Sequence, residues 1–330
     1  MNRRKFIMLL GGAAVWPLAA HAQQGQLTRR IGVLLAFDES DSRAKGWLSR
    51  FGKALSELGW TDGRNLRMDV RWARDDIDRM RLLAKELVDL QPNVILAFGT
   101  PVTAALQRET RTIPIVFAIV SDPVGEGFVA SLSNPGGNIT GFHNSEASIG
   151  GKWLELLTQI APRIKRAAMI FNPETAPGHG KYYMRDFEAA APSFDVTPIA
   201  APVHSLDELE AAISDLGREP GGGFIAMADF FLLNHRMSMI ALAARNNVPG
   251  IYPWREVPTA GGLLSYGPDL EDIVRRAAPY VDRILRGANP ANLPVQVPTK
   301  FEIVVNVKTA KALGLDVPAS ILVRADALIE

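Results

Sequence analysis

Polar side chains that could bind a small charged molecule follow the apolar segments in the first half of the chain. They are Asp38, Ser40, Thr100, Pro101, Ser121 and Asp122. Thr100 stands between Gly99 and Pro101, and proline favours the first position of a helix, which predicts Thr100 as the N-cap. The N–H groups that begin a helix also bind anions, so Thr100 could seat a carboxylate as well as cap. Ser40 or Ser42 could cap a helix in the same way, or the loop could face a ligand.

A second set of polar and aromatic residues follows the apolar segments of the later half. It comprises Asn172, Thr175, Asp229, Trp254 and Arg255. Aromatic rings beside charged groups suit a flat or zwitterionic small molecule. Phe230 and Phe231 could belong either to such a site or to the interior of a helix.

Signatures of catalysis, of metal binding and of nucleotide binding are missing. The chain has no cysteine, no G-x-G-x-x-G after a strand, no phosphate-loop lysine motif and no G-x-S-x-G. No histidine has metal-ligand spacing, and Asp75, Asp76 and Asp78 precede a helix that acidic residues would cap. We therefore expect no cofactor, no metal and no enzyme activity.

Apolar strands alternate with amphipathic helices along the chain, which predicts an α/β fold. The order βαβαβαβ runs to about residue 120, a turn cluster follows at 133–138, and the same pattern restarts at 150. We expect two Rossmann-like lobes with parallel sheets, in which each strand end faces a cleft. One helix is expected over 232–245. The boundaries are 29–141 plus 267–298 for lobe 1, and 142–266 plus 299–330 for lobe 2.

The N-terminus has the pattern of an export signal. Arg3, Arg4 and Lys5 precede an apolar run at 6–18, and Ala20-His21-Ala22 fits a cleavage site, which predicts cleavage after Ala22 and a periplasmic protein. The arginine pair fits export by the twin-arginine route, and the general secretory route is the alternative. A second alternative is that the segment stays uncleaved as a membrane anchor. A formal net charge of +1 leaves no basic footprint for nucleic acid.

Several strings resemble the ABC-transporter substrate-binding proteins related to the tryptophan/tyrosine-type binding components. They are "FGTPVTAAL", "VFAIVSDPVGEGFVASLSNPGGNITGF", "IFNPETAP", "GGLLSYGPD" and "PTKFEIVVNVKTAKALGLDVP". The resemblance implies the type I periplasmic-binding fold, in which a three-segment hinge joins two lobes that close around a ligand. Thr100 and the following N–H groups would hold a carboxylate, Asp122 would lie in the lobe 1 wall, Asn172 and Asp229 would contribute from lobe 2, and Tyr266 would lie near a crossover.

This chain departs from the family at Trp254 and Arg255, where members thought to bind amino acids tend to be small and acidic. An arginine facing the cleft would favour a second anionic group on the ligand. We expect a monomeric periplasmic receptor that delivers a small carboxylate-bearing, aromatic or amino-acid-like ligand to an ABC permease in the inner membrane. A sensory module that presents the closed lobes to a membrane receptor is the alternative. An exported enzyme using the cleft would need an aligned acid/base pair, for which Asp122 and Asp229 are the candidates.

Overall fold

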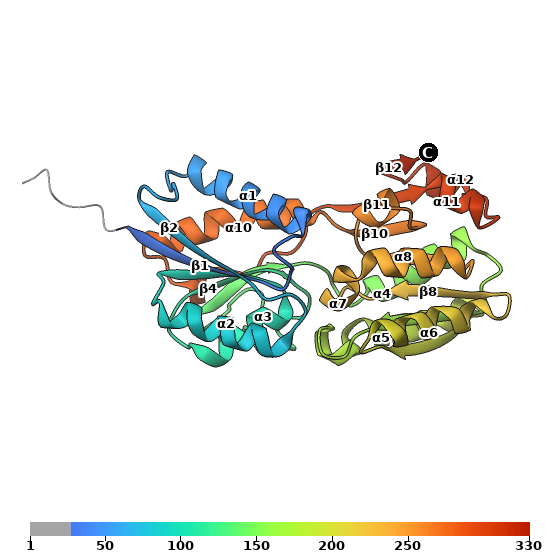
Figure 1. Cartoon of the computed structure of the whole chain (residues 1–330), viewed down its shortest axis with the longest axis horizontal. Helices are drawn as coiled ribbons and strands as arrows, with labels where there is room; N and C mark the ends of the chain where they lie inside the picture. Colours follow the sequence, from blue (N-terminus) through green and yellow to red (C-terminus); the bar gives the residue numbers. More distant parts are fainter. Residues whose placement is uncertain (1–27) are drawn as a thin grey trace, which may run out of the picture.

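The computed structural model describes residues 28–330, and the expected export signal at 1–22 lies outside them. The chain forms two α/β lobes that lie side by side (Figure 1). The expected α/β architecture with two mainly parallel sheets is confirmed. Within residues 28–330 no helix has the length and apolarity needed to cross a membrane.

The sheet of the first lobe has five parallel strands in the order β2-β1-β3-β4-β5. The strands are β1 (Arg29–Leu35), β2 (Leu66–Trp72), β3 (Val94–Phe98), β4 (Ile115–Val120) and β5 (Ile139–His143). One face is covered by α2 (Ile77–Asp89) and α3 (Thr100–Glu109), and the other by α1 (Ser42–Glu57) and α10 (Leu270–Leu285) (Figure 1). Strands β3 and β4 are buried throughout, as helices on both faces require.

The sheet of the second lobe has seven strands in the order β12-β11-β10-β9-β8-β6-β7, and β11 runs antiparallel to β10. The strands are β6 (Arg166–Phe171), β7 (Thr197–Pro202), β8 (Gly222–Ala226), β9 (Gly250–Tyr252), β10 (Leu264–Pro268), β11 (Phe301–Asn306) and β12 (Ala327–Ile329). The helices are α4 (Ile149–Ile160), α5 (Lys181–Ala190), α6 (Leu206–Gly217), α7 (Phe230–Asn234), α8 (Arg236–Arg245), α9 (Glu256–Thr259), α11 (Val307–Ala312) and α12 (Ala319–Leu322).

Three segments connect the two sheets. The chain passes from β5 to α4, from β10 to α10, and from the end of α10 back to β11. The returning segment runs beside β5, where the N–H of His143 donates to the carbonyl of Gln296. The indole N–H of Trp153 donates to the carbonyl of Tyr266 at 2.7 Å and ties α4 to the second crossing.

Three local expectations were wrong. Asp41, rather than Ser40 or Ser42, caps α1, because its carboxylate accepts from the N–H groups of Arg43 and Ala44. Gly99, rather than Thr100, is the N-cap of α3, so Thr100 is its first helical residue. The single helix expected over 232–245 is two helices, since the backbone of His235 departs from helical geometry between α7 and α8.

Candidate functional site

Each sheet has a point at which the strand order reverses, and this is where open parallel sheets bind ligands. In lobe 1 the reversal lies between β1 and β3, and in lobe 2 it lies between β6 and β8. The chain leaves these strands at Ala36 and Gly99 in lobe 1, and at Asn172 and Met227 in lobe 2. The loops that hold Asp38, Thr100, Asn172 and Asp229 therefore follow the two switch points.

Helix α7 of lobe 2 fills the space beside the switch point of lobe 1. The ring of Phe230 lies against Gly99, where an added Cβ would be 2.3 Å from the ring, and it packs edge-on to Phe37 with centroids 5.3 Å apart. The side-chain amide of Asn234 donates to the carbonyl of Ala36 at 3.1 Å. One apolar cluster is thereby continuous from lobe 1 into lobe 2. We call this arrangement, with the lobes in contact, the closed arrangement.

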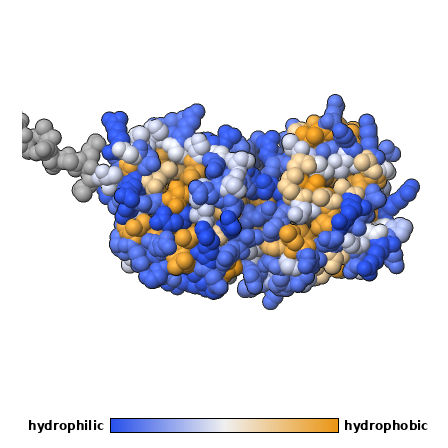
Figure 2. Space-filling model, viewed as in Figure 1, coloured by the Kyte–Doolittle hydropathy of each residue, from blue (hydrophilic) through white to orange (hydrophobic). Residues whose placement is uncertain are grey.

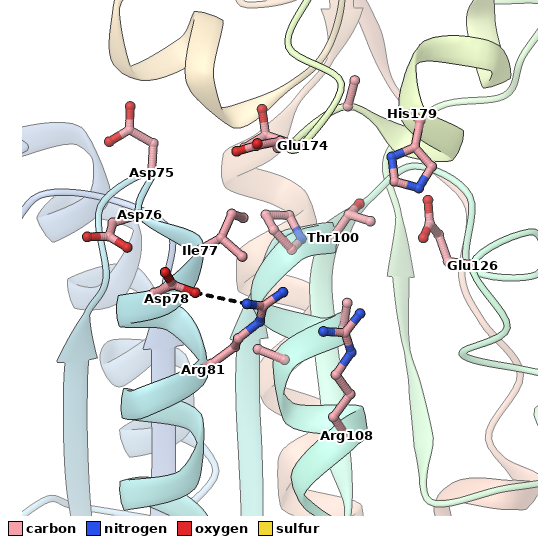
Figure 3. A pocket seen from close by; sticks show the side chains of 15 residues that line it. Asp75, Asp76, Ile77, Asp78, Arg81, Thr100, Arg108, Glu126, Glu174 and His179 are labelled. Carbon is pink, nitrogen blue, oxygen red and sulfur yellow. Dashed lines mark hydrogen bonds and ion pairs between the residues drawn. The ribbon is translucent and has the colours of Figure 1, made fainter. Parts of the chain in front are cut away.

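A cavity with a volume of about 620 Å³ lies between the lobes. We call it the first cavity. Lobe 1 contributes the start of α2, the exposed side of α3 and Glu126, and lobe 2 contributes the segment 174–179 (Figure 3). Its lining residues are Asp75, Asp76, Ile77, Asp78, Arg81, Thr100, Pro101, Ala104, Ala105, Arg108, Glu126, Glu174, Thr175, Ala176 and His179. The surface where the lobes meet is mainly hydrophilic in the view of Figure 2.

Most of the carboxylates around the first cavity have partners in the protein. Asp75 pairs with His235 of lobe 2 at 3.0 Å, and Asp78 pairs with Arg81 at 2.8 Å. Glu126 accepts from the N–H of Gly178 at 2.8 Å, which joins the lobes on another side of the cavity. The hydrogen bond from His235 is the main reason why the pKa of Asp75 lies below its ordinary value.

Two opposite charges on opposite walls have no such partner among residues 28–330. Glu174 belongs to lobe 2 and Arg108 to lobe 1, and neither side chain makes an ion pair or a side-chain hydrogen bond there. Figure 3 draws both beside the space that Thr100 also lines. This arrangement offers a carboxylate to a cation and a guanidinium to an anion.

The N-terminus of α3 adds a second anion-binding group to the first cavity. Helices α1 and α2 are capped by the carboxylates of Asp41 and Asp76, whereas α3 begins at Gly99 without a side-chain cap. Thr100 and Pro101 of its first turn line the cavity. The N–H of Thr100 and the helix dipole therefore favour a negatively charged ligand group at this corner.

Asp229 does not line the first cavity, but it holds the lining residue Thr175 in position. Its carboxylate accepts from the N–H of Asn172 at 3.0 Å, from the Thr175 hydroxyl at 3.2 Å and from the N–H of Leu232 at 2.8 Å, so that it also caps α7. The side chain is only 2% exposed, and burial raises its pKa to about 7. Thr175 lines the cavity, so Asp229 acts on the wall through Thr175.

The remaining predicted residues lie apart from the first cavity. Asp38 binds the N–H and hydroxyl of Ser40 and pairs with Arg74. Ser121 is buried, and Asp122 accepts from the N–H of Gly125 within its own turn at 2.8 Å.

Trp254, Arg255 and Tyr266 line two other cavities. Arg255 pairs with the buried Glu302 at 2.9 Å and does not line the first cavity, so its guanidinium offers no second anion-binding group there. The first cavity thus brings together Thr100, Pro101 and Thr175 from the predicted set.

The charged or polar residues of the first cavity that lie outside the predicted site set are Asp75, Asp76, Asp78, Arg81, Arg108, Glu126, Glu174 and His179. Glu174 stands in the loop that supplied Asn172 and Thr175, and its position after β6 was the available signal. Arg108 lies two turns beyond Thr100 on the same helix, which the 3.6-residue period could have indicated. No group of three or more His, Cys, Asp or Glu side chains within 28–330 is arranged to hold a metal ion.

Known proteins share the sequence pattern and the fold. The family model described as ABC transporter substrate binding protein matches residues 31–329. A tyrosine-binding protein of Clostridioides difficile (strain R20291) is 27% identical over 289 residues, covering 87% of this chain and 81% of that protein. The resemblance noted in the sequence is therefore confirmed.

Two solved structures have the same two-lobe architecture. The ABC domain from Streptococcus pneumonia in complex with L-Trp is 23% identical with a TM-score of 0.83, covering 92% of this chain and 100% of that chain. A ligand-free, open substrate binding protein with adhesive properties from Clostridium difficile is 24% identical with a TM-score of 0.66, covering 91% and 99%.

Proposed function

Because the chain belongs to the ABC transporter substrate-binding protein family, we propose that it captures a zwitterionic, amino-acid-like molecule in the first cavity. The observation that carries this is the pair of unpartnered charges, Glu174 and Arg108, which face the cavity from different lobes. An ammonium group would bind Glu174, and a carboxylate would bind Arg108 together with the N–H of Thr100. The tyrosine-binding relative and the tryptophan complex support an aromatic amino acid as the first ligand to test.

Capture would couple binding to closure of the lobes. A ligand held by Glu174 and Arg108 contacts both lobes only when they are together, so it favours the closed arrangement. We propose that residues 29–141 plus 267–298 and residues 142–266 plus 299–330 move as two units about the three crossing segments. The closed protein would then deliver its ligand, unchanged, from the periplasm to an ABC permease in the inner membrane.

Calorimetry with matched ligands tests the site. L-Tyrosine, tyramine and 3-(4-hydroxyphenyl)propionate share the ring, while tyramine lacks the carboxylate and the propionate lacks the amine. We expect L-tyrosine to bind most tightly. Glu174→Gln should remove the advantage of tyrosine over the propionate, and Arg108→Gln should remove its advantage over tyramine.

The control is Glu188→Gln on the exposed side of α5, away from the cavity, which should bind like the wild type. Equal binding of L-tyrosine, L-tryptophan and related zwitterions by Glu174→Gln, Arg108→Gln and the wild type would contradict the assignment to the first cavity.

A further inference from the structure

A second cavity lies between the lobes, beside the crossing from β10 to α10. Its volume is about 390 Å³. We call it the second cavity. Lobe 1 contributes Arg43 and Trp47 of α1 together with Leu270 and Glu271 of α10. Lobe 2 contributes the segment 254–260, and Pro268 at the crossing also lines the space. A molecule bound here would therefore contact both lobes and one of the connections between them.

The charged side chains that line the second cavity all have partners. Arg43 pairs with Asp41 at 3.1 Å and, across the lobes, with Glu256. Arg255 pairs with Glu302 at 2.9 Å, and Glu271 pairs with Arg50 at 3.1 Å. A charged ligand entering this space would lose hydration without finding an unpaired opposite charge, so the second cavity selects against charged molecules.

The remaining lining favours a flat ring. Trp47 of lobe 1 and Trp254 of lobe 2 both line the space, together with Ala260, Pro268 and Leu270. Only 3% of Trp47 and 5% of Trp254 is exposed, so a planar apolar ligand would pack against these small exposed parts of the indoles and against the neighbouring aliphatic side chains.

One hydrogen-bond donor at the second cavity is unsatisfied. The guanidinium of Arg43 lies over the ring of Trp47 at 5.1 Å, and its Nε–H is buried without an acceptor among the described residues. A buried donor without a partner destabilises a protein, because it has lost its hydration and gained no acceptor in exchange. Because this Nε atom has almost no accessible surface, an acceptor oxygen or nitrogen on a ligand would relieve it by drawing the Arg43 side chain round towards the cavity.

We propose that the second cavity is a binding site for a small, uncharged aromatic molecule that carries a hydrogen-bond acceptor. Its walls come from both lobes, so occupancy stabilises the closed arrangement. By thermodynamic linkage the same occupancy raises the affinity of the first cavity for its ligand. The site differs from the first cavity in residues and in ligand charge; binding at the second cavity stands by itself, and only the linkage rests on the function proposed above.

Coumarin is a suitable probe, since it is planar, uncharged and carries a carbonyl acceptor. Its binding to the full protein is measured by ligand-observed NMR and calorimetry, beside coumarin-3-carboxylate and indole, which lacks a carbonyl. We expect coumarin to bind about tenfold more tightly than the carboxylate, a difference of about 1.4 kcal/mol, and more tightly than indole. In urea below the unfolding transition, small-angle scattering should show a smaller radius of gyration with coumarin than without it.

A variant that fills the second cavity with a large side chain tests whether coumarin binds there. Ala260 lines the second cavity and is exposed, so Ala260→Trp should occupy the space, fold normally and weaken coumarin binding by about tenfold or more. Thr259→Phe is a second filling variant, should the first fold poorly. Ala189→Trp, on exposed α5, is the matched control and should leave coumarin binding unchanged.

Absence of coumarin binding, or equal binding by Ala260→Trp, Thr259→Phe and the wild type, would overturn the site. Equal binding of the carboxylate would overturn its selection for uncharged ligands. Failure of Glu174→Gln to alter amino acid binding would contradict only the first cavity, so the two proposals fail separately.

Discussion

The two cavities between the lobes differ in the state of their charges. The first has an unpartnered carboxylate and an unpartnered guanidinium on opposite walls, Glu174 and Arg108, whereas each charged side chain lining the second already has a partner. Both lie between the same two lobes. The comparison teaches that two spaces between the same lobes can offer a ligand different chemistry, because the charges of one are paired within the protein and those of the other are not.

Helix α7 and the start of α8 connect the two regions. His235 bonds to Asp75, which lines the first cavity, and Arg236 lies 3.5 Å from Asp41, the partner of Arg43 in the second. Phe230 lies between these contacts against Gly99. A change at the contact between Phe230 and Gly99 should therefore affect both cavities. A change to a residue that lines only one cavity should affect only that cavity.

Gly99→Ala should have the largest effect, because it would disturb both cavities at once. Gly99 has a φ of +112°, and an added Cβ would lie 2.3 Å from the ring of Phe230. The strained backbone should lower the free energy of unfolding by about 1–3 kcal/mol, and the collision should separate the lobes and weaken binding at both cavities. Urea unfolding and calorimetry with tyrosine and coumarin measure these effects.

Gly59→Ala is the control that introduces backbone strain without a collision between the new Cβ and a neighbouring side chain. Gly59 has a φ of +94°, yet a Cβ added to it would meet nothing within 4 Å. We expect this variant to lose stability while it binds both ligands normally. If Gly59→Ala impaired binding as much as Gly99→Ala does, the contact between Gly99 and Phe230 would not hold the lobes together.

Asp229→Ala should alter the first cavity and leave the second unchanged. The variant removes the cap of α7 and leaves the donors of Asn172 and Thr175 without their acceptor, so unfolding should require about 1–3 kcal/mol less. Thr175 loses its fixed position, and tyrosine affinity should fall with it. Asp229→Asn keeps one acceptor oxygen and should lose about half as much stability.

The same carboxylate makes the stability depend on pH. Burial raises the folded pKa from 3.8 to about 7, so the folded state retains a proton that the unfolded state releases in this range. The contribution of Asp229 to stability is fully present below about pH 4 and is lost as the pH rises through 7. Urea unfolding from pH 4 to 8 should show a shallower decline in Asp229→Asn, and an unchanged slope would contradict this assignment.

Glu256→Gln should make the second cavity resemble the first. The substitution removes one of the two carboxylates that pair with Arg43 and leaves Asp41 as its remaining anion. Coumarin-3-carboxylate should then bind a few-fold to about tenfold more tightly than it binds the wild type, while coumarin changes little. Glu271→Gln is the control, because the pair of Glu271 with Arg50 is about half exposed and screened by water.

The sequence predicted the lobes better than it predicted the site, for a physical reason. Strands such as Val94–Phe98 and Ile115–Val120 are buried on both faces, and their apolar runs report this directly. The site depends on pairing between lobes, which residue type does not reveal. Arg255 looked available for an anion until Glu302, 47 positions later, proved to be its partner. Asp75 was interpreted as part of a helix start, and its partner His235 lies in the other lobe.

Asp75→Asn should have the smallest effect on binding. It should lower the affinity of both cavities, because it weakens a contact that holds the lobes together. The bond between Asp75 and His235 joins the lobes at 3.0 Å, and both side chains are less than a third exposed, so its loss should weaken closure by about 0.3–1 kcal/mol. Tyrosine and coumarin affinities should each fall by about two- to fivefold, a change that calorimetry resolves. Because the pKa of Asp75 is lowered, its stabilising contribution is present above pH 3.8 and is lost as the pH falls below it.

A helix cap away from both cavities provides the control for this weakest contact between the lobes. Ser205→Ala removes the cap of α6, so it should reduce stability while it leaves closure and both affinities intact. If Asp75→Asn weakened tyrosine binding and left coumarin binding unchanged, Asp75 would act only as part of the wall of the first cavity. The two cavities would then not share one closure equilibrium, and the linkage between them would be wrong even if each bound its own ligand.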